Sequence, residues 1–217
     1  MKKTLNLIWI LVPTLLIVMS AGCALNKPYP NKSYHLPHIE SPGRAATEPP
    51  TFPHRIKVRN LRVESPFEGK SFVYRLGDDQ WTTDFYHEWF TFPRDILTEN
   101  CVAYLTHKSS FGLISTEDSL VDAAYYLEGT LNSFHQDRRN AQSMNAVVRT
   151  RWVLIPNKPL SNAMEKTLLW SKEFDVHVPC KTDTPQAFAV AMATAMEQTF
   201  ESLDTELINH FKPPVVK

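Results

Sequence analysis

The segment NAVVRTRWVLI, residues 145–155, alternates residue by residue within this chain of 217 residues. Small or apolar side chains occupy every second position, and arginines stand between them, which is the pattern of a strand with one buried and one solvated face. The first face carries Ala146, Val148, Thr150, Trp152 and Leu154, and the second carries Arg149 and Arg151. The segment therefore predicts a half-buried β-strand.

Similar segments lie on both sides of it. Residues 123–135 place Tyr125, Leu127, Gly129 and Leu131 on one face, and residues 136–143 form a polar turn. After a loop at residues 156–162, a third strand is marked by Leu168, Trp170, Phe174 and Val176. Three sequential strands joined by short polar loops predict an antiparallel meander.

The strands expected before this meander are shorter. Residues 55–63 alternate, with a slip of phase at Asn60-Leu61 that indicates a bulge or a strand end. Residues 71–76 and 81–86 flank the turn Gly77-Asp78-Asp79 and predict a hairpin.

Helix start and stop residues, together with apolar side chains at helical spacing, predict two helices. Pro93 suits a first helical position, and an apolar stripe at helical spacing runs on until Lys108 and Gly112, about four turns later. Thr184 and Pro185 open a longer helix over residues 185–210. The element order predicts an α/β fold of the α+β type: a single mixed β-sheet with an antiparallel meander and two main helices packed on it.

The amino terminus has the anatomy of a secretory signal. Lys2 and Lys3 precede an apolar run from residue 5 to 18, and small residues then end in Cys23. We predict a signal peptide over residues 1–22, cleaved before Cys23, whose thiol carries an N-acyl diacylglyceryl lipid. An uncleaved membrane anchor and ordinary secretion are the alternatives, but the apolar run is shorter than the ~20 residues that span a bilayer.

The distribution of proline along the chain indicates the domain organisation. Residues 23–54 hold seven of the sixteen prolines and predict a semi-rigid tether, in which residues 33–38 could form a short edge strand. The folded domain is expected over residues 55–212, with a tail at residues 213–217. Because 23 basic and 23 acidic residues balance, the chain has no charge footprint for nucleic acid.

Few residue patterns in this sequence indicate a disulfide, a metal site or a catalytic site. Cys101 and Cys180 could form a disulfide in an oxidising compartment, although Cys101 also fits a small buried side chain. We expect no metal site and no cofactor apart from the covalent lipid on Cys23, since no histidine stands at ligand spacing from the cysteines. Asp84 and His87 could serve a hydrolase, or they could form a polar edge on an aromatic turn.

The densest aromatic segment is FYHEWFTFP, residues 85–93. Such rings more often fasten a hairpin to a helix, but tyrosine and tryptophan also dominate protein interfaces. Because alternation cannot bury every ring at once, we predict that Tyr86 or Trp89 is exposed. Tyr86, His87 and Trp89 are therefore the candidate partner-binding residues.

These motifs occur in an order that resembles a known family. Along the chain come the Cys23 motif, Tyr34-x-Leu36, Phe72-Val73-Tyr74-Arg75, Asp84-Phe85-Tyr86 with Trp89 and Pro93, Tyr126-Leu127-x-Gly129 and an alanine-rich final helix. The order resembles the ABC-type transport auxiliary lipoproteins. The resemblance implies a domain related in shape to the amino-terminal domain of TolB.

The resemblance also implies a function without enzymatic activity. Such lipoproteins accompany an inner-membrane ABC transporter and a tunnel-forming protein of the mammalian-cell-entry (MCE) type, which together move lipids or other hydrophobic molecules across the envelope. Ala24 after the cysteine, by similarity to sorted lipoproteins, favours the outer membrane, with the domain in the periplasm. Some family members form rings, so a homo-oligomer is a further expectation. The competing hypotheses are a periplasmic ligand or lipid carrier and the hydrolase.

Overall fold

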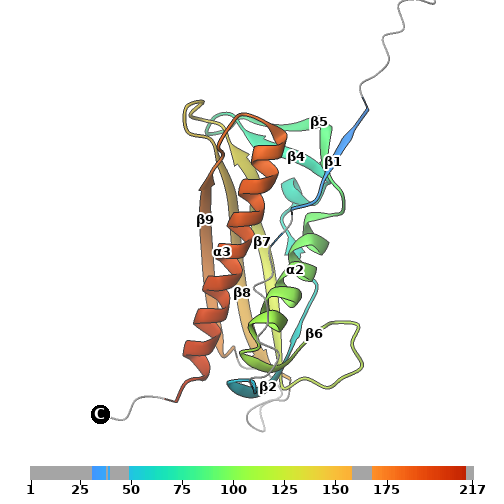
Figure 1. Ribbon diagram of the computed structural model, residues 1–217, viewed down its shortest axis with the longest axis vertical. Helices are drawn as coiled ribbons and strands as arrows, with labels where there is room; N and C mark the ends of the chain where they lie inside the picture. The colour runs from blue at the N-terminus through green and yellow to red at the C-terminus, as the bar shows by residue number, and fades with distance from the viewer. Residues whose placement is uncertain (1–30, 38, 40–48, 158–167, 214–217) are drawn as a thin grey trace, which may run out of the picture. The chain divides into compact units, whose positions relative to one another are not determined.

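Strand β7 (Tyr125–Asp137) is the centre around which the sheet is built. The computed structural model describes residues 31–37, 39, 49–157 and 168–213. One edge of β7 pairs antiparallel with β8 (Asn145–Pro156), and β8 pairs antiparallel with β9 (Trp170–Pro179). The predicted meander is therefore confirmed (Figure 1).

The other edge of β7 pairs in parallel with three consecutive short strands. These are β2 (Phe52–Val58), β3 (Arg62–Val63) and β4 (Ser71–Arg75), which meet β7 near its start, its middle and its end. The phase slip expected at Asn60-Leu61 is the break between β2 and β3. Parallel and antiparallel pairs thus share one mixed sheet, as predicted.

Three more strands complete a sheet of nine strands among the described residues. Strand β5 (Trp81–Trp89) pairs antiparallel with β4, and β1 (Ser33–His35) pairs in parallel with β5. Strand β6 (Phe111–Thr116) pairs in parallel with β2 and was not predicted. Its residues FGLIST are buried at the first and fourth positions rather than at every second one, so no period of two marks it. The 3-10 turn η2 (Ser65–Phe67) precedes β4.

The folded part begins before residue 55. Strand β1 lies inside the predicted tether, where an edge strand was expected, and β2 already starts at Phe52. The Phe52 side chain is buried and its ring lies 5.7 Å from that of Phe111 and 6.0 Å from that of Phe211. Through these apolar contacts, the end of the predicted tether is part of the folded domain.

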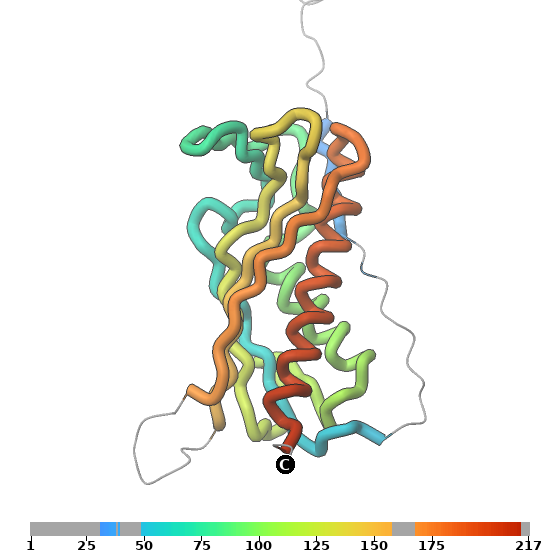
Figure 2. Tube along the Cα trace, turned by 90° about the vertical axis from the view of Figure 1, so that its left-hand side faces the viewer, coloured from blue at the N-terminus to red at the C-terminus, as the bar shows by residue number. Residues whose placement is uncertain are grey.

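Both helices cover the same face of the sheet (Figure 2). Helix α2 (Pro93–Lys108) contacts β6 and α3, and helix α3 (Pro185–Phe211) contacts β8 and β9. The predicted start signals are confirmed, because both prolines occupy the first turn and the Thr184 hydroxyl accepts a hydrogen bond from the backbone N–H of Ala187 at 3.2 Å. The side chains that β8 sends to this face are fully buried, as the alternation predicted: Ala146, Val148, Thr150, Trp152 and Leu154.

At Gly129 the β7 backbone lies directly against this core. A Cβ atom there would lie 2.8 Å from Cγ of Leu61 and 2.9 Å from the Trp152 ring. The Trp152 ring therefore packs directly over the β7 backbone, in space that any side chain would occupy.

Ion pairs lie along the opposite face of the sheet. Arg149 on β8 pairs with Asp175 on β9, with its Nη2 atom 2.6 Å from Oδ2. Arg59, just after β2, pairs with Glu117 at 3.2 Å and with Glu128 at 2.7 Å. Exposed ion pairs of this kind contribute little to stability. Part of this face is covered, since Val147 and His135 are buried and the His135 ring lies 5.9 Å from the Phe67 ring and 4.8 Å from the Trp81 ring.

The cysteines do not pair, which contradicts the proposed disulfide. Cys101 and Cys180 are both free thiols. Cys101 is fully buried on α2, and this burial raises the pKa of its thiol. Cys180 lies after β9, where its Sγ atom accepts a hydrogen bond from the Gln136 amide at 3.4 Å. The two thiols belong to different elements, and Cys101 is enclosed by apolar side chains.

Several predicted features lie outside the described residues. These are the signal peptide at residues 1–22, the lipidated Cys23 and the end of the tail at residues 214–217. Within the described ranges, neither helix is long and apolar enough to cross a bilayer.

Candidate docking surface

Strand β5 carries a large bulge opposite β4. Ser71 pairs with Glu88 and Val73 pairs with Thr83, so β4 advances by two residues while β5 advances by five. Residues 84–87 therefore stand outside the register with β4, although His87 pairs with Ser33 of β1 on the other side of β5. A bulge of this kind redirects side chains that simple alternation would place on a known face.

The carboxylate of Asp84 holds this bulge together. Its Oδ1 atom accepts hydrogen bonds from the backbone N–H groups of Tyr86 at 2.8 Å and of His87 at 3.1 Å. Its Oδ2 atom accepts a hydrogen bond from the Tyr74 hydroxyl at 2.7 Å and lies 2.9 Å from Nδ1 of His87. Both oxygens of the carboxylate are therefore engaged, and the bulge has one defined shape.

The charge on Asp84 is stabilised by these bonds. Partial burial acts to raise the pKa of Asp84, but the hydrogen bonds from Tyr74, Tyr86 and His87 outweigh it and hold that pKa below its usual value. Burial, followed by the bond to the carboxylate, raises the pKa of the Tyr74 phenol. Asp84 is thus an ionised brace and Tyr74 a neutral donor.

A second histidine stands behind the bulge. The His35 ring on β1 lies 5.6 Å from the His87 ring and 4.9 Å from the Phe72 ring. Burial, followed by the neighbouring His87, lowers the pKa of His35, and its buried Nε2 atom has no hydrogen-bond partner. His35 therefore packs as a neutral ring that ties β1 to β5.

The bulge separates the predicted partner-binding residues. Tyr86 is 41% exposed and the neighbouring Phe85 is 63% exposed, with their rings 5.1 Å apart. His87 is half-buried behind them. Trp89, in contrast, is 1% exposed, and its ring lies 4.2 Å from that of Phe72. The candidate role of Trp89 at a partner contact is therefore contradicted, because the strand returns to its ladder after the bulge and turns this ring into the core.

The exposed rings extend beyond the bulge. Tyr34 and Leu36 come from β1 and its continuation, and Phe90 and Phe92 come from the connection between β5 and α2. We call the set the aromatic edge: Tyr34, Leu36, Phe85, Tyr86, Phe90 and Phe92. It accounts for six of thirteen large apolar side chains that are exposed in the described structure. Sequence analysis missed Tyr34 and Leu36 at this site because their strand partner, β5, is distant along the chain.

Two lysines sit among these rings. The ammonium of Lys32 pairs with Glu88 and lies 5.3 Å from the centroid of the Phe85 ring. The ammonium of Lys70 lies 4.9 Å from the centroid of the Phe92 ring. The aromatic edge thus combines rigid rings with cations, a composition typical of binding surfaces.

The structure brings together the two residues of the hydrolase hypothesis, but their surroundings do not favour catalysis. Asp84 and His87 are in contact, yet the carboxylate is saturated by bonds that shape the bulge. The hydroxyl that reaches it belongs to Tyr74, whose raised pKa opposes a role as a nucleophile. Across the described ranges, no group of three or more histidine, cysteine, aspartate or glutamate side chains could hold a metal ion.

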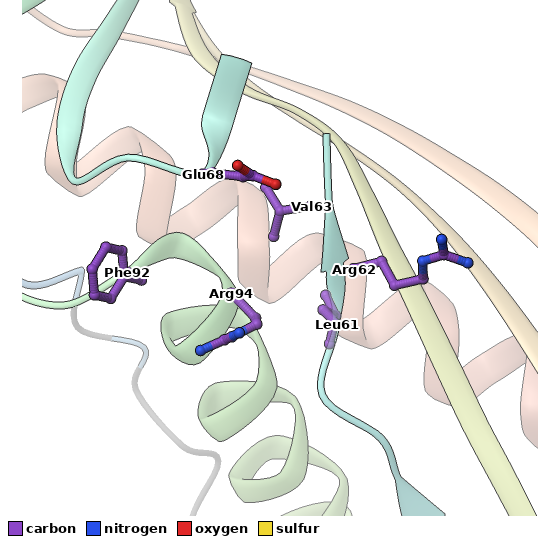
Figure 3. A pocket seen from close by; sticks show the side chains of 6 residues that line it. All are labelled: Leu61, Arg62, Val63, Glu68, Phe92 and Arg94. Atoms are coloured by element: carbon purple, nitrogen blue, oxygen red, sulfur yellow. The ribbon is translucent and has the colours of Figure 1, made fainter. Parts of the chain in front are cut away.

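A pocket of about 620 Å³ lies between β3 and the start of α2 (Figure 3). It exists because β3 is only two residues long and has the helix rather than another strand on its outer side. Its lining is half charged: Leu61, Arg62, Val63, Glu68, Phe92 and Arg94. Such a lining differs from the apolar cavity that a lipid carrier requires.

The fold and the exposed edge define a class of protein, an α+β domain with one open mixed sheet, two helices on one face and an aromatic surface suited to binding. The family model of the ABC-type transport auxiliary lipoprotein component matches residues 34–203. The chain belongs to this family. Membership suggests a protein of the cell envelope that assists transport rather than an enzyme.

Solved structures share the fold. Protein XCC0632 from Xanthomonas campestris has a TM-score of 0.71 at 14% identity, covering 82% of this chain and 95% of that one. A structure described as an uncharacterized protein has a TM-score of 0.62 at 15% identity, covering 82% and 99%. The hypothetical protein CT253 from Chlamydia trachomatis has a TM-score of 0.51 at 7% identity, covering 73% and 97%. No curated protein sequence matches the chain.

Proposed function

We propose that this protein is an outer-membrane-anchored docking subunit of an ABC transport system. A lipid on Cys23 holds the domain in the periplasm, where it binds an MCE-type tunnel protein linked to the inner-membrane transporter. The assembly moves lipids or other hydrophobic molecules across the envelope. Family membership, the Cys23 motif and Ala24 support this proposal.

The observation that carries the docking role is the braced bulge of β5. Interfaces gain most of their binding free energy from a few rigid side chains, and tyrosine is among the commonest of them. Tyr86 is exposed, while its backbone N–H is fixed by Asp84 at 2.8 Å. Because the backbone that carries the ring is already fixed, less conformational entropy is lost when a partner covers Tyr86.

The decisive experiment is capture of the tunnel protein by Tyr86→Ala. We expect binding to weaken by about 2 kcal/mol, roughly thirtyfold in Kd, without loss of folding. Trp81→Ala is the matched control, since Trp81 is 43% exposed on the same strand but stands outside the aromatic edge. Undiminished capture by Tyr86→Ala, with the control unchanged as well, would remove the bulge from the interface.

The anchor is tested separately. Cys23→Ser should move the protein from the outer-membrane fraction to the soluble periplasmic fraction, because the acyl chains that stabilise membrane attachment are lost. If that variant still sediments with membranes, the lipid is not the anchor.

The carrier hypothesis makes a different prediction. A lipid carrier would retain stoichiometric lipid in native mass spectrometry of the Cys23→Ser protein, whereas a docking subunit would give the mass of the bare chain. Bound lipid in that spectrum would replace the docking proposal with the carrier.

A further inference from the structure

The aromatic edge has a second part that the bulge does not explain. Tyr34, Leu36, Phe90 and Phe92 are 58%, 61%, 67% and 46% exposed, and we call them the tether-side patch. The Tyr34 and Phe90 rings touch edge to face, with their centroids 6.5 Å apart. The Tyr34–Phe90 contact and Lys70, which reaches both Phe90 and Phe92, join three of these side chains into one surface. Leu36 follows on the continuation of β1, beside α3.

Backbone bonds fix this patch. The N–H of Phe90 donates to the carbonyl oxygen of His35 at 2.8 Å, which joins the connection to β1. The ammonium of Lys70 donates to the carbonyl oxygen of Phe90 at 3.1 Å and lies over the Phe92 ring. The patch is thus a set of exposed apolar side chains with a cation held among them.

The position of the patch in the sequence limits how far it can lie from Cys23. Lys32 directly precedes β1, and nine peptide steps separate it from Cys23. A fully extended chain of that length reaches at most about 32 Å. In Figure 1, β1 runs beside β5, next to the connection into α2. The patch therefore begins at Tyr34, two residues after Lys32, where the chain leaves the domain toward Cys23, and extends along β1 away from that point.

We propose that the tether-side patch binds the surface of the phospholipid leaflet that holds the Cys23 lipid. The inference rests on the proposed function for that lipid. Aromatic rings settle at the level of lipid headgroups, and lysines beside them attract anionic headgroups while their stems cover apolar surface. Phe90 and Phe92 enter the interface, and Lys70 meets the phosphates.

A weak patch suffices for this role. The tether turns membrane contact into an intramolecular event, for which short flexible linkers give effective concentrations in the millimolar range. Contact at the patch orients the domain and leaves the bulge, with Phe85 and Tyr86, available to a protein partner. The two parts of the aromatic edge thus have separate ligands, a leaflet and a protein.

The test uses the soluble Cys23→Ser protein and vesicles of phosphatidylethanolamine mixed with phosphatidylglycerol. With vesicles in large excess we expect part of it to cosediment, through a contact too weak to keep it in the membrane fraction of cells, and the further double substitution Phe90→Ser and Phe92→Ser to lower the partition coefficient at least about tenfold. Tyr86→Ala in the same background is the matched control and should bind vesicles unchanged. Lys70→Glu should weaken binding to these vesicles more than to vesicles of pure phosphatidylcholine.

The double variant is expected to fold. Phe92 is the N-cap residue of α2 and makes no side-chain cap, and serine is a favourable residue at that position. If circular dichroism nevertheless shows an unfolded protein, Tyr34→Ser with Leu36→Ser tests the same surface from β1.

The outcomes separate the two proposals. Failure of the Cys23→Ser protein to bind any vesicle, or equal binding by the folded patch variants, overturns the membrane contact while leaving the docking role intact. Patch variants that keep vesicle binding but lose the tunnel protein would identify the patch as a protein interface instead. Loss of capture by Tyr86→Ala alone, with loss of vesicle binding by the patch variants alone, is the result expected if both proposals hold.

Discussion

The brace at Asp84 gives the sharpest prediction about stability. Asp84→Ala removes the acceptor of two backbone N–H groups and of the Tyr74 hydroxyl. Water can replace the acceptor for the exposed amide of Tyr86, but the Tyr74 side chain is only 7% exposed and its hydroxyl loses its partner. A hydrogen bond to a charged group contributes about 1.5–3 kcal/mol, and an unpaired buried hydroxyl costs about 1–3 kcal/mol. We therefore expect a loss of about 3 kcal/mol in the free energy of unfolding.

Urea unfolding followed by circular dichroism measures this loss. Asp84→Asn keeps one carbonyl oxygen and should lose about half as much. In a double-mutant cycle with Tyr74→Phe, the coupling energy should reach about 1 kcal/mol or more, because the two groups share one bond. Asp79→Ala, an exposed aspartate in the adjoining turn, controls for removal of a charge. A loss for Asp84→Ala no larger than that of the control would refute the brace.

The pH dependence has a definite sign. Because the folded pKa of Asp84 lies below its usual value, its stabilisation is fully present above the unfolded pKa, about 4. The stabilisation is lost as pH falls through the folded pKa. The stability difference between the wild-type protein and Asp84→Asn should therefore shrink as the pH is lowered below about 4, and a constant difference would show that the carboxylate charge is not involved.

Three further predictions concern the core and the thiols. Gly129→Ala places a Cβ 2.8 Å from a buried side chain and should lower the free energy of unfolding in urea by about 1–3 kcal/mol. Gly69→Ala is the control, because its Cβ would have no atom within 4 Å and should cost far less. Equal losses in the two variants would contradict the packing at Gly129. Trp89→Ala should destabilise by about 3–5 kcal/mol, since the ring is buried, and a small loss would return it to the surface. A thiol reagent should label half-buried Cys180 in the native protein, and it should label Cys101 only after unfolding. Because burial raises the pKa of the Cys180 thiol, more of the reactive thiolate forms as the pH rises, and labelling should become faster. Two native thiols that react only after reduction would indicate a disulfide.

Local periodicity was sufficient for the helices and the meander. Helix α2 starts at Pro93 and ends at Lys108, and α3 starts at Pro185, because caps and prolines act on their own neighbours. The alternation of residues 145–155 correctly assigned the five side chains that β8 buries beneath the helices, but it missed Val147, which is buried on the opposite face. These signals depend on contacts within a few residues, and a single sequence contains them in full.

Strand pairing was less accessible. The sequence does not reveal that β2, β3 and β4 share one edge of β7, or that β6 joins β2, because partners in parallel pairs lie tens of residues apart. Without these pairings the short strand at residues 111–116 was not recognised.

The docking surface divides in the same way. The sequence by itself determined that residues 85–92 concentrate aromatic rings and that Tyr86 or Trp89 would be exposed. Only the tertiary structure decided between them, since Asp84 bends β5 into a bulge that turns Tyr86 outward and Trp89 into the core. The same structure brought Tyr34 next to Phe90 through the pairing of β1 with β5. The bonds from the Tyr86 and His87 amides to Asp84 are local, but the bond from Tyr74 comes from β4, and alternation along the chain contains no record of the register shift between the two strands.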